Sequence, residues 1–133
     1  MLKEILSISG KPGLYKLVSQ AKGMLVVESL ITGKRIPAYA HDKIMSLGDI
    51  SIYTEEEDRP LAEVFETIKE KESGKAVDIA KGASIDEYRN YVESVIPDYD
   101  RERVYPNDIK RIVDWYNIVV NAGITEFIEK TEE

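Results

Sequence analysis

With 133 residues, 43% of them hydrophobic, the chain is long enough to bury a modest core as one domain or as a small domain with a helical extension. It contains no cysteine, which excludes disulfides, thiolate catalysis and thiolate metal sites. Its apolar runs are too short for a signal peptide or a membrane span, so we expect a cytoplasmic protein without a membrane partner.

The net charge of −7 is unevenly distributed along the chain. Residues 1–54 contain seven basic and four acidic side chains, a balance of +3, so the remainder carries −10. Two interpretations stay open: ordinary solvated surfaces with an acidic run at 55–58, or a polarity that is used in binding.

Short β-type runs separated by glycine turns make up the first half of the chain. Pro37 cannot donate a ladder hydrogen bond, which places it at a sheet edge or a bulge. Segment 2–8 is predicted to be a strand or one helical turn, and segment 41–49 a loop or one helical turn. Strands are predicted at 14–20, 24–32, 35–40 and 50–54. Four to five such strands predict a small SH3-like β-barrel over residues 1–58.

Amphipathic helical stretches follow the predicted barrel, over residues 59–133. Ser84 and Glu87 form a capping box that starts one of these helices. Helices are predicted at about 60–72, from 84 to the stop at Pro97, and from 107 or 108 to 121, with a linker at 73–83. The predicted fold class is α+β, a barrel followed by about three helices.

The segments LKEILSISGKPGLYKLVSQ, VVESL, KRIPAYA and DISIYTEEEDRPLAEVF, with PNDIKRIVDWYN nearer the end, resemble an uncharacterised family of small bacterial proteins. In that family an SH3-like N-terminal barrel precedes a helical C-terminal region. The resemblance covers the whole chain and implies this fold and a cytoplasmic location. It implies no activity and supplies no site residues.

The sequence patterns that could indicate catalysis lack the residue spacing that the known catalytic motifs require. The Gly10-Lys11 and Gly33-Lys34 pairs lack the surroundings of a phosphate loop. His41 is the single histidine, so neither a catalytic triad nor a histidine-rich metal site can be specified. We therefore predict no catalytic residue, no metal and no cofactor. One enzymatic alternative stays open, a site between barrel and helices that pairs His41 with a carboxylate.

Aromatic and basic residues supply the candidate interaction sites. Trp115 points about 100° away from Tyr116, which lies on an apolar stripe. A tryptophan at such a boundary suits a partner or a dimer mate, although packing against the barrel explains it equally well. A basic, aromatic-bearing face of the barrel would suit RNA or an acidic peptide. The candidate residues are Trp115, Tyr39, His41, Lys34, Arg35 and Lys43.

The leading hypothesis is a non-enzymatic protein-interaction or self-association module, with a protein partner or a second copy of the chain. The first alternative is an RNA- or single-strand-binding regulator, which the −10 region would disfavour by repelling a polyanion. The second alternative is the small enzyme.

Overall fold

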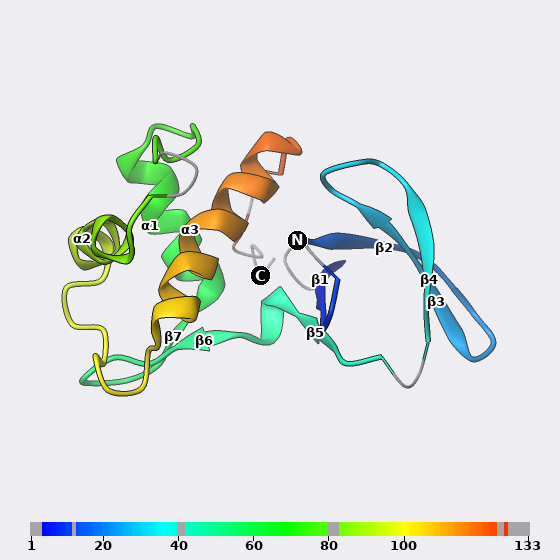
Figure 1. The fold of residues 1–133 in the computed structure, drawn as a ribbon, viewed down its shortest axis with the longest axis horizontal. Coiled ribbons are helices and arrows are strands. Elements are labelled where there is room, and N and C mark those ends of the chain that lie inside the picture. Colours follow the sequence, from blue (N-terminus) through cyan, green and yellow to red (C-terminus); the bar gives the residue numbers. More distant parts are fainter. Residues whose placement is uncertain (1–3, 12, 40–41, 80–82, 125–126, 128–133) are drawn as a thin grey trace, which may run out of the picture.

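Five antiparallel strands form one half of the molecule and three helices form the other, joined by a short connecting segment (Figure 1). The structure is a computed structural model, and it describes residues 4–11, 13–39, 42–79, 83–124 and 127. The strands of the large sheet are β1 (Ile5–Ile8), β2 (Tyr15–Ala21), β3 (Met24–Ser29), β4 (Arg35–Tyr39) and β5 (Ile44–Ser46). A 3₁₀ turn (Leu47–Asp49), β6 (Ser51–Ile52), β7 (Arg59–Pro60), α1 (Leu61–Lys71), α2 (Ile85–Val95) and α3 (Pro106–Asn121) follow.

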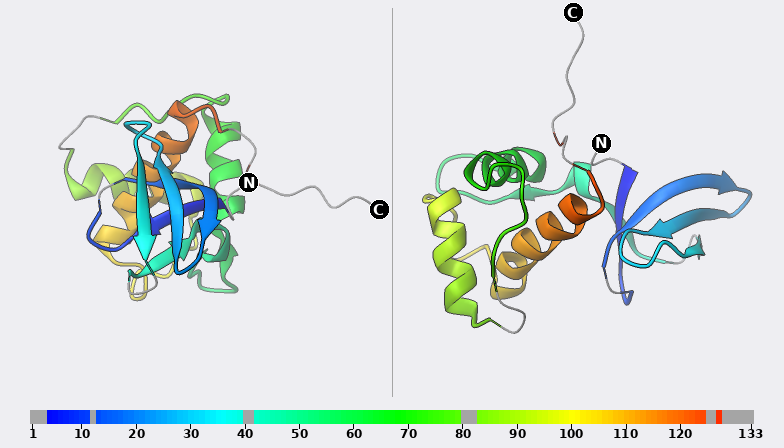
Figure 2. Two further views of the ribbon diagram at one scale, coloured as in Figure 1. Left: turned by 90° about the vertical axis from the view of Figure 1, so that its right-hand side faces the viewer. Right: turned by 90° about the horizontal axis from the view of Figure 1, so that it is seen from above.

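The large sheet has the strand order β4-β3-β2-β1-β5. Two of its hairpin turns contain Gly23 (φ +78°) and Gly33 (φ +75°), in a conformation that glycine adopts without strain. The strands predicted at 14–20, 24–32 and 35–40 are confirmed as β2, β3 and β4, which extend away from the helices (Figure 2). Pro37 lies in the edge strand β4, as its missing N–H predicts.

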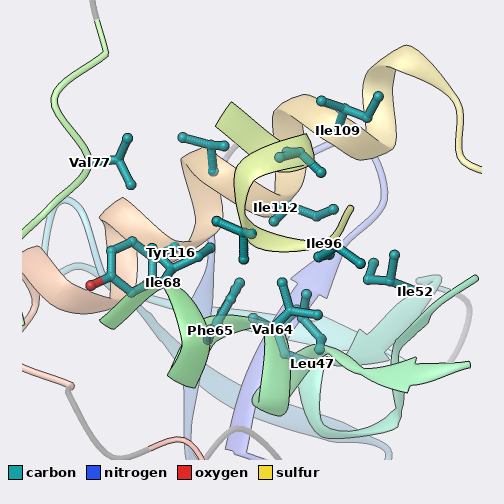
Figure 3. Packing of buried hydrophobic residues seen from close by; sticks show 14 of the residues in the cluster. Leu47, Ile52, Val64, Phe65, Ile68, Val77, Ile96, Ile109, Ile112 and Tyr116 are labelled. Atoms are coloured by element: carbon teal, nitrogen blue, oxygen red, sulfur yellow. The ribbon is translucent and has the colours of Figure 1, made fainter. Parts of the chain in front are cut away.

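The sheet is not closed into a barrel, because among the described strands β4 and β5 are its two unpaired edges. The predicted SH3-like barrel is therefore not confirmed. The strand predicted at 50–54 forms β6, which pairs with β7 in a separate two-stranded sheet. The fifth strand is β5, within the stretch predicted to be a loop or a helical turn. The segment after β5 leaves the large sheet because the side chains of Leu47 and Ile52 are buried among the helices (Figure 3).

The buried apolar residues form two clusters, one in the sheet and one among the helices. Ile5 and Leu6 are neighbours in β1 and therefore face opposite sides of the sheet. Ile5 belongs to the larger cluster, which the helices build, whereas Leu6 belongs to the smaller cluster within the sheet. The smaller cluster consists of Leu6, Ile8, Tyr15, Val27 and Ala38. Strand β1 is thus shared by both cores, and Ile5 connects the sheet to the helical core.

The three predicted helices are confirmed as α1, α2 and α3. Ser84 caps α2, since its Oγ accepts the N–H of Glu87 at 3.4 Å. Pro106 opens α3, where a missing N–H costs nothing, one residue before the predicted start. None of the helices that the structure describes has the length and apolar composition needed to cross a membrane.

The described part of the predicted linker at 73–83 is hydrogen-bonded to side chains of α3. The Tyr116 hydroxyl donates to the carbonyl of Lys75 at 2.8 Å. Asn117 accepts the N–H of Val77 at 2.7 Å and donates to the Val77 carbonyl at 3.2 Å. Through these bonds one turn of α3 satisfies the backbone of a segment without regular structure.

Phe127, beyond the end of α3, packs against two helices. Its side chain is buried, and its ring centroid lies 5.5 Å from that of Phe65 and 6.0 Å from that of Tyr116. The Phe65 and Tyr116 rings also meet edge to face, at 5.9 Å. The three rings form an aromatic cluster that joins α1, α3 and the segment after α3.

Candidate functional site

A groove lies where the segment from β5 to β6 meets the loop before α3 and the first turns of that helix. It contains a cavity of about 270 Å³, which we call the Trp115 groove. Its base is apolar and its walls carry large side chains. Residues that define it are the buried Ile52, Leu61 and Ile112 at the base, Met45, Tyr53 and Trp115 in the walls, and Arg103 and Arg111 beside them.

Two lining residues of the Trp115 groove are exposed apolar or aromatic side chains. Met45 is 56% exposed and Tyr53 is 42% exposed, although both contact a cavity with a buried apolar base. Trp115 is partly buried and packs against the larger core, whereas its neighbour Tyr116 is fully buried. This is the boundary position that the 100° rotation per helical residue predicts.

Arg103 fixes one wall of the groove. Its guanidinium lies over the Tyr53 ring, 4.4 Å from the centroid. Its Nε donates to Asp100 Oδ2 at 2.7 Å, and an Nη donates to the carbonyl of Thr54 at 3.4 Å. The hydrogen bond from Arg103 holds the pKa of the Asp100 carboxyl below its usual value. Arg103 is therefore committed to positioning Tyr53.

Arg111 also lines the groove, and it makes fewer contacts than Arg103. Its guanidinium lies 5.9 Å from the centroid of the Trp115 ring, and its side chain is 58% exposed. It pairs with Asp108 at 3.7 Å, one turn earlier in α3. Asp108 also accepts the N–H of Tyr105 at 3.1 Å and so stabilises the start of the helix.

A second hollow adjoins the groove on the other side of Trp115. It measures about 360 Å³ and shares Arg111 and Trp115 with the Trp115 groove. Gly13, Lys110 and Asp114 are among its other lining residues. The two hollows are thus neighbours that meet at Arg111 and Trp115 of α3.

The other predicted site residues lie elsewhere. Lys34 and Arg35 precede or begin β4, and Arg35 pairs with Glu28 at 3.3 Å. Tyr39 ends the same strand, about 13 Å from Arg35 at the usual rise per residue. Lys43 follows towards β5. Lys34 and Arg35 are thus adjacent at the start of β4, Lys43 lies beyond the other end of that strand, and none of the three lines the Trp115 groove.

His41 lies outside the described residues. Tyr39 is 44% exposed and lines a different hollow, at the open end of the sheet.

The candidate residues predicted from the sequence did not include Arg111, Met45 and Arg103 of the Trp115 groove. Arg111 precedes Trp115 by one helical turn, so the i, i+4 rule places both on one face of α3 and would have found it. Met45 and Arg103 come from segments that meet α3 only through tertiary packing, and their spacing carries no signal.

Three residues of the acidic run, Glu56, Glu57 and Asp58, line a separate polar hollow at the start of α1, with Glu63 and Asp98. Within the described part of the chain, no three acidic or histidine side chains are arranged to hold a metal ion.

Two family models match the chain. Residues 2–47 match "Domain of unknown function (DUF5606)" and residues 50–119 match "Domain of unknown function (DUF6852)". The two matches meet at the 3₁₀ turn before β6, and the Trp115 groove takes Met45 from the first region and Trp115 from the second. No curated protein matches the chain.

Among solved structures, the chain is similar to a Bacteroides vulgatus protein determined by solution NMR as a structural-genomics target. The two are 58% identical, the alignment covers 96% of this chain and 91% of that one, and the TM-score is 0.78. The family model for residues 50–119 spans more than half of the 133 residues. The chain therefore belongs to the DUF6852 family of small bacterial proteins.

Proposed function

We propose that the protein is a non-enzymatic protein-interaction module and that the Trp115 groove is its binding surface. One observation carries the proposal: tyrosine, tryptophan and two arginines meet around a single apolar cavity. These are the residue types that dominate binding energy at protein interfaces, where they sit in pockets that exclude water. Exposed Met45 adds a flexible apolar contact of the kind that binding surfaces use.

The chemistry of the groove supports binding over catalysis. Its charged lining residues are Arg103, Asp108 and Arg111. Arginine does not release its proton in proteins, and general acid–base catalysis needs a group that does. Asp108 is engaged at the start of α3 and with Arg111. The groove thus offers contact surface and arginine hydrogen-bond donors, which suit recognition.

Selection of random linear peptides displayed on phage tests the proposal. We expect peptides that bind the wild-type protein and lose binding to Met45→Glu, which places a charge in the groove. Val18→Glu is the matched control, because Val18 is an exposed apolar residue of β2, outside the groove. Peptides that bind all three proteins equally, or the absence of any enriched peptide, would show that the groove is not a binding surface.

Light scattering on the purified protein addresses self-association. We expect the mass of a monomer at both low and moderate salt. A salt-resistant dimer that Met45→Glu dissociates would instead make a second copy of the chain the occupant of the groove. Absorbance at 260 nm measured on the same samples reports any bound nucleic acid.

A further inference from the structure

Tyr53, a lining residue of the Trp115 groove, is held through both its backbone and its side chain. Its carbonyl accepts the N–H of Asp100 at 2.9 Å, and its ring lies 4.4 Å from the Arg103 guanidinium, measured from the ring centroid. The carbonyl of the next residue, Thr54, accepts a hydrogen bond from Arg103 at 3.4 Å. All of these contacts come from the loop between α2 and α3.

Asp100 organises the part of this loop that makes the contacts. Its Oδ1 accepts the backbone N–H groups of Glu102 and Arg103 at 2.9 and 3.2 Å, which shapes a turn. Its Oδ2 accepts the Nε–H of Arg103 at 2.7 Å. A charge-assisted bond of this length is roughly twice as strong as a bond between neutral groups. One carboxylate therefore holds both the backbone and the guanidinium of Arg103.

Asp100 lies behind the surface of the groove. The described lining of the cavity includes Tyr53 and Arg103 but not Asp100, whose side chain is 23% exposed. An effect of Asp100 on binding must therefore pass through Arg103 and Tyr53. A side chain that is already immobilised loses less conformational entropy on binding, which is worth about two- to tenfold in affinity.

On the basis of the proposed function, we infer that Asp100 is a positioning residue of the Trp115 groove. It orients Arg103, and Arg103 in turn holds the Tyr53 ring in place before an occupant arrives. Met45, which is exposed and has a flexible side chain, supplies a contact that adapts to the occupant. The groove thus combines one preformed contact with one adaptable contact.

Asp100→Asn separates the two roles of the carboxylate. The asparagine oxygen still accepts the N–H groups of Glu102 and Arg103, which keeps the turn, whereas the amide nitrogen cannot accept from the Arg103 guanidinium. We expect the affinity for peptides selected on the wild-type protein to fall about two- to tenfold. The association rate constant should carry this loss, because fewer free molecules hold Tyr53 in the binding position, and the dissociation rate constant should be unchanged.

Trp115 emission followed by stopped flow measures both rate constants, because Trp115 is the single tryptophan of the chain. Unchanged far-UV circular dichroism and an unchanged melting temperature relative to the control variant show that a change in rate does not come from unfolding.

A second arginine of the same loop provides the matched control. Arg101 pairs with Glu93 at 3.3 Å and lies 4.5 Å from the centroid of the Tyr99 ring, the same order of acid, arginine and tyrosine. The structure describes all three residues, and none of them lines the groove. Glu93→Gln should therefore bind the selected peptides with the rate constants of the wild type.

NMR spectra of the free proteins test the positioning without a peptide. In the wild type we expect a slowly exchanging Arg103 Nε–H signal and couplings that correspond to one χ1 rotamer of Tyr53. In Asp100→Asn the Arg103 signal should exchange faster and the Tyr53 couplings should average over rotamers. Identical Tyr53 couplings in the two proteins would overturn the inference and leave the proposed function standing.

The binding experiment distinguishes the remaining failures. If the peptides lose binding to Met45→Glu but bind Asp100→Asn with wild-type rate constants, or lose affinity only through faster dissociation, the positioning role is wrong and the proposed function stands. Peptides that are indifferent to Met45→Glu, or the absence of any enriched peptide, would overturn both.

Discussion

Asn117 holds the irregular segment after α1 against α3, and replacing it by alanine tests that role. Asn117→Ala removes both side-chain bonds to Val77, at 2.7 and 3.2 Å. Each such bond contributes about 1 kcal/mol net, so the loss is about 2 kcal/mol. Alanine returns about 0.5 kcal/mol through its higher helix propensity. The free energy of unfolding should therefore fall by about 1.5 kcal/mol.

Thermal unfolding followed by circular dichroism measures this change. An unfolding entropy of about 2.1 cal/mol/K per residue gives about 0.28 kcal/mol/K for 133 residues, so the melting temperature should fall by about 5 °C. Native-state hydrogen exchange adds a local readout, because the Val77 amide should exchange about tenfold faster or more in the variant.

The control is Asn90→Ala, at an exposed position of α2, where only the gain in helix propensity applies. We expect this variant to be as stable as the wild type or slightly more so. Equal melting temperatures for the two variants, together with unchanged protection of the Val77 amide, would refute the role assigned to Asn117.

Three further outcomes are expected. Phe127→Ala should lower the free energy of unfolding by about 3–5 kcal/mol in urea titrations, because it removes a ring from the aromatic cluster; a loss below about 1 kcal/mol would show that this ring does not hold the fold. Ser84→Ala should cost about 1 kcal/mol through the lost cap, and an unchanged melting midpoint would place the start of α2 elsewhere. Arg103→Gln should raise the pKa of Asp100 towards its ordinary value in an NMR titration, since the Arg103 hydrogen bond lowers it. A carboxyl whose pKa is lowered by folding stabilises the folded state at pH values above its pKa in the unfolded chain. That stabilisation is lost as the pH falls through its pKa in the folded protein. The difference in unfolding free energy between Arg103→Gln and wild type should therefore become smaller in acid.

Sequence alone predicts the elements whose signals are local. Gly23 and Gly33 mark two hairpin turns, and the cap at Ser84 marks the start of α2. The structure confirms these because each signal acts within a few residues of the element that it specifies.

Elements that depend on a distant partner are harder to predict. Strand β5 has three residues and exists because Ser46, Met45 and Ile44 pair with Leu6, Ser7 and Ile8 of β1. Strand β6 has an apolar face that fits a barrel or a helical layer equally well, and only the position of α1 decides between them. A barrel was predicted because sequence pattern cannot show which layer covers Ile52.

The candidate site divides in the same way. Trp115 follows from helical geometry, since a residue next to buried Tyr116 must turn towards the edge of the core. The stacking of Arg103 on Tyr53 joins residues fifty positions apart and leaves no periodic trace in the sequence. Chemistry-bearing residues on one helix can be grouped from sequence, whereas a groove between two segments requires the fold.

Pro37 has a consequence for how molecules of this protein meet. The bond from the Ser29 N–H to the Lys34 carbonyl sets the alternation along β4, so that residues 35, 37 and 39 direct their backbone groups away from β3. Proline has no N–H to offer there, and the Tyr39 N–H already donates to Asp42 at 2.8 Å. An incoming strand would therefore find two of the three donors on this edge missing or occupied. The β4 edge of the open sheet is in this way protected from adding strands of other molecules, the step by which exposed edges nucleate aggregates.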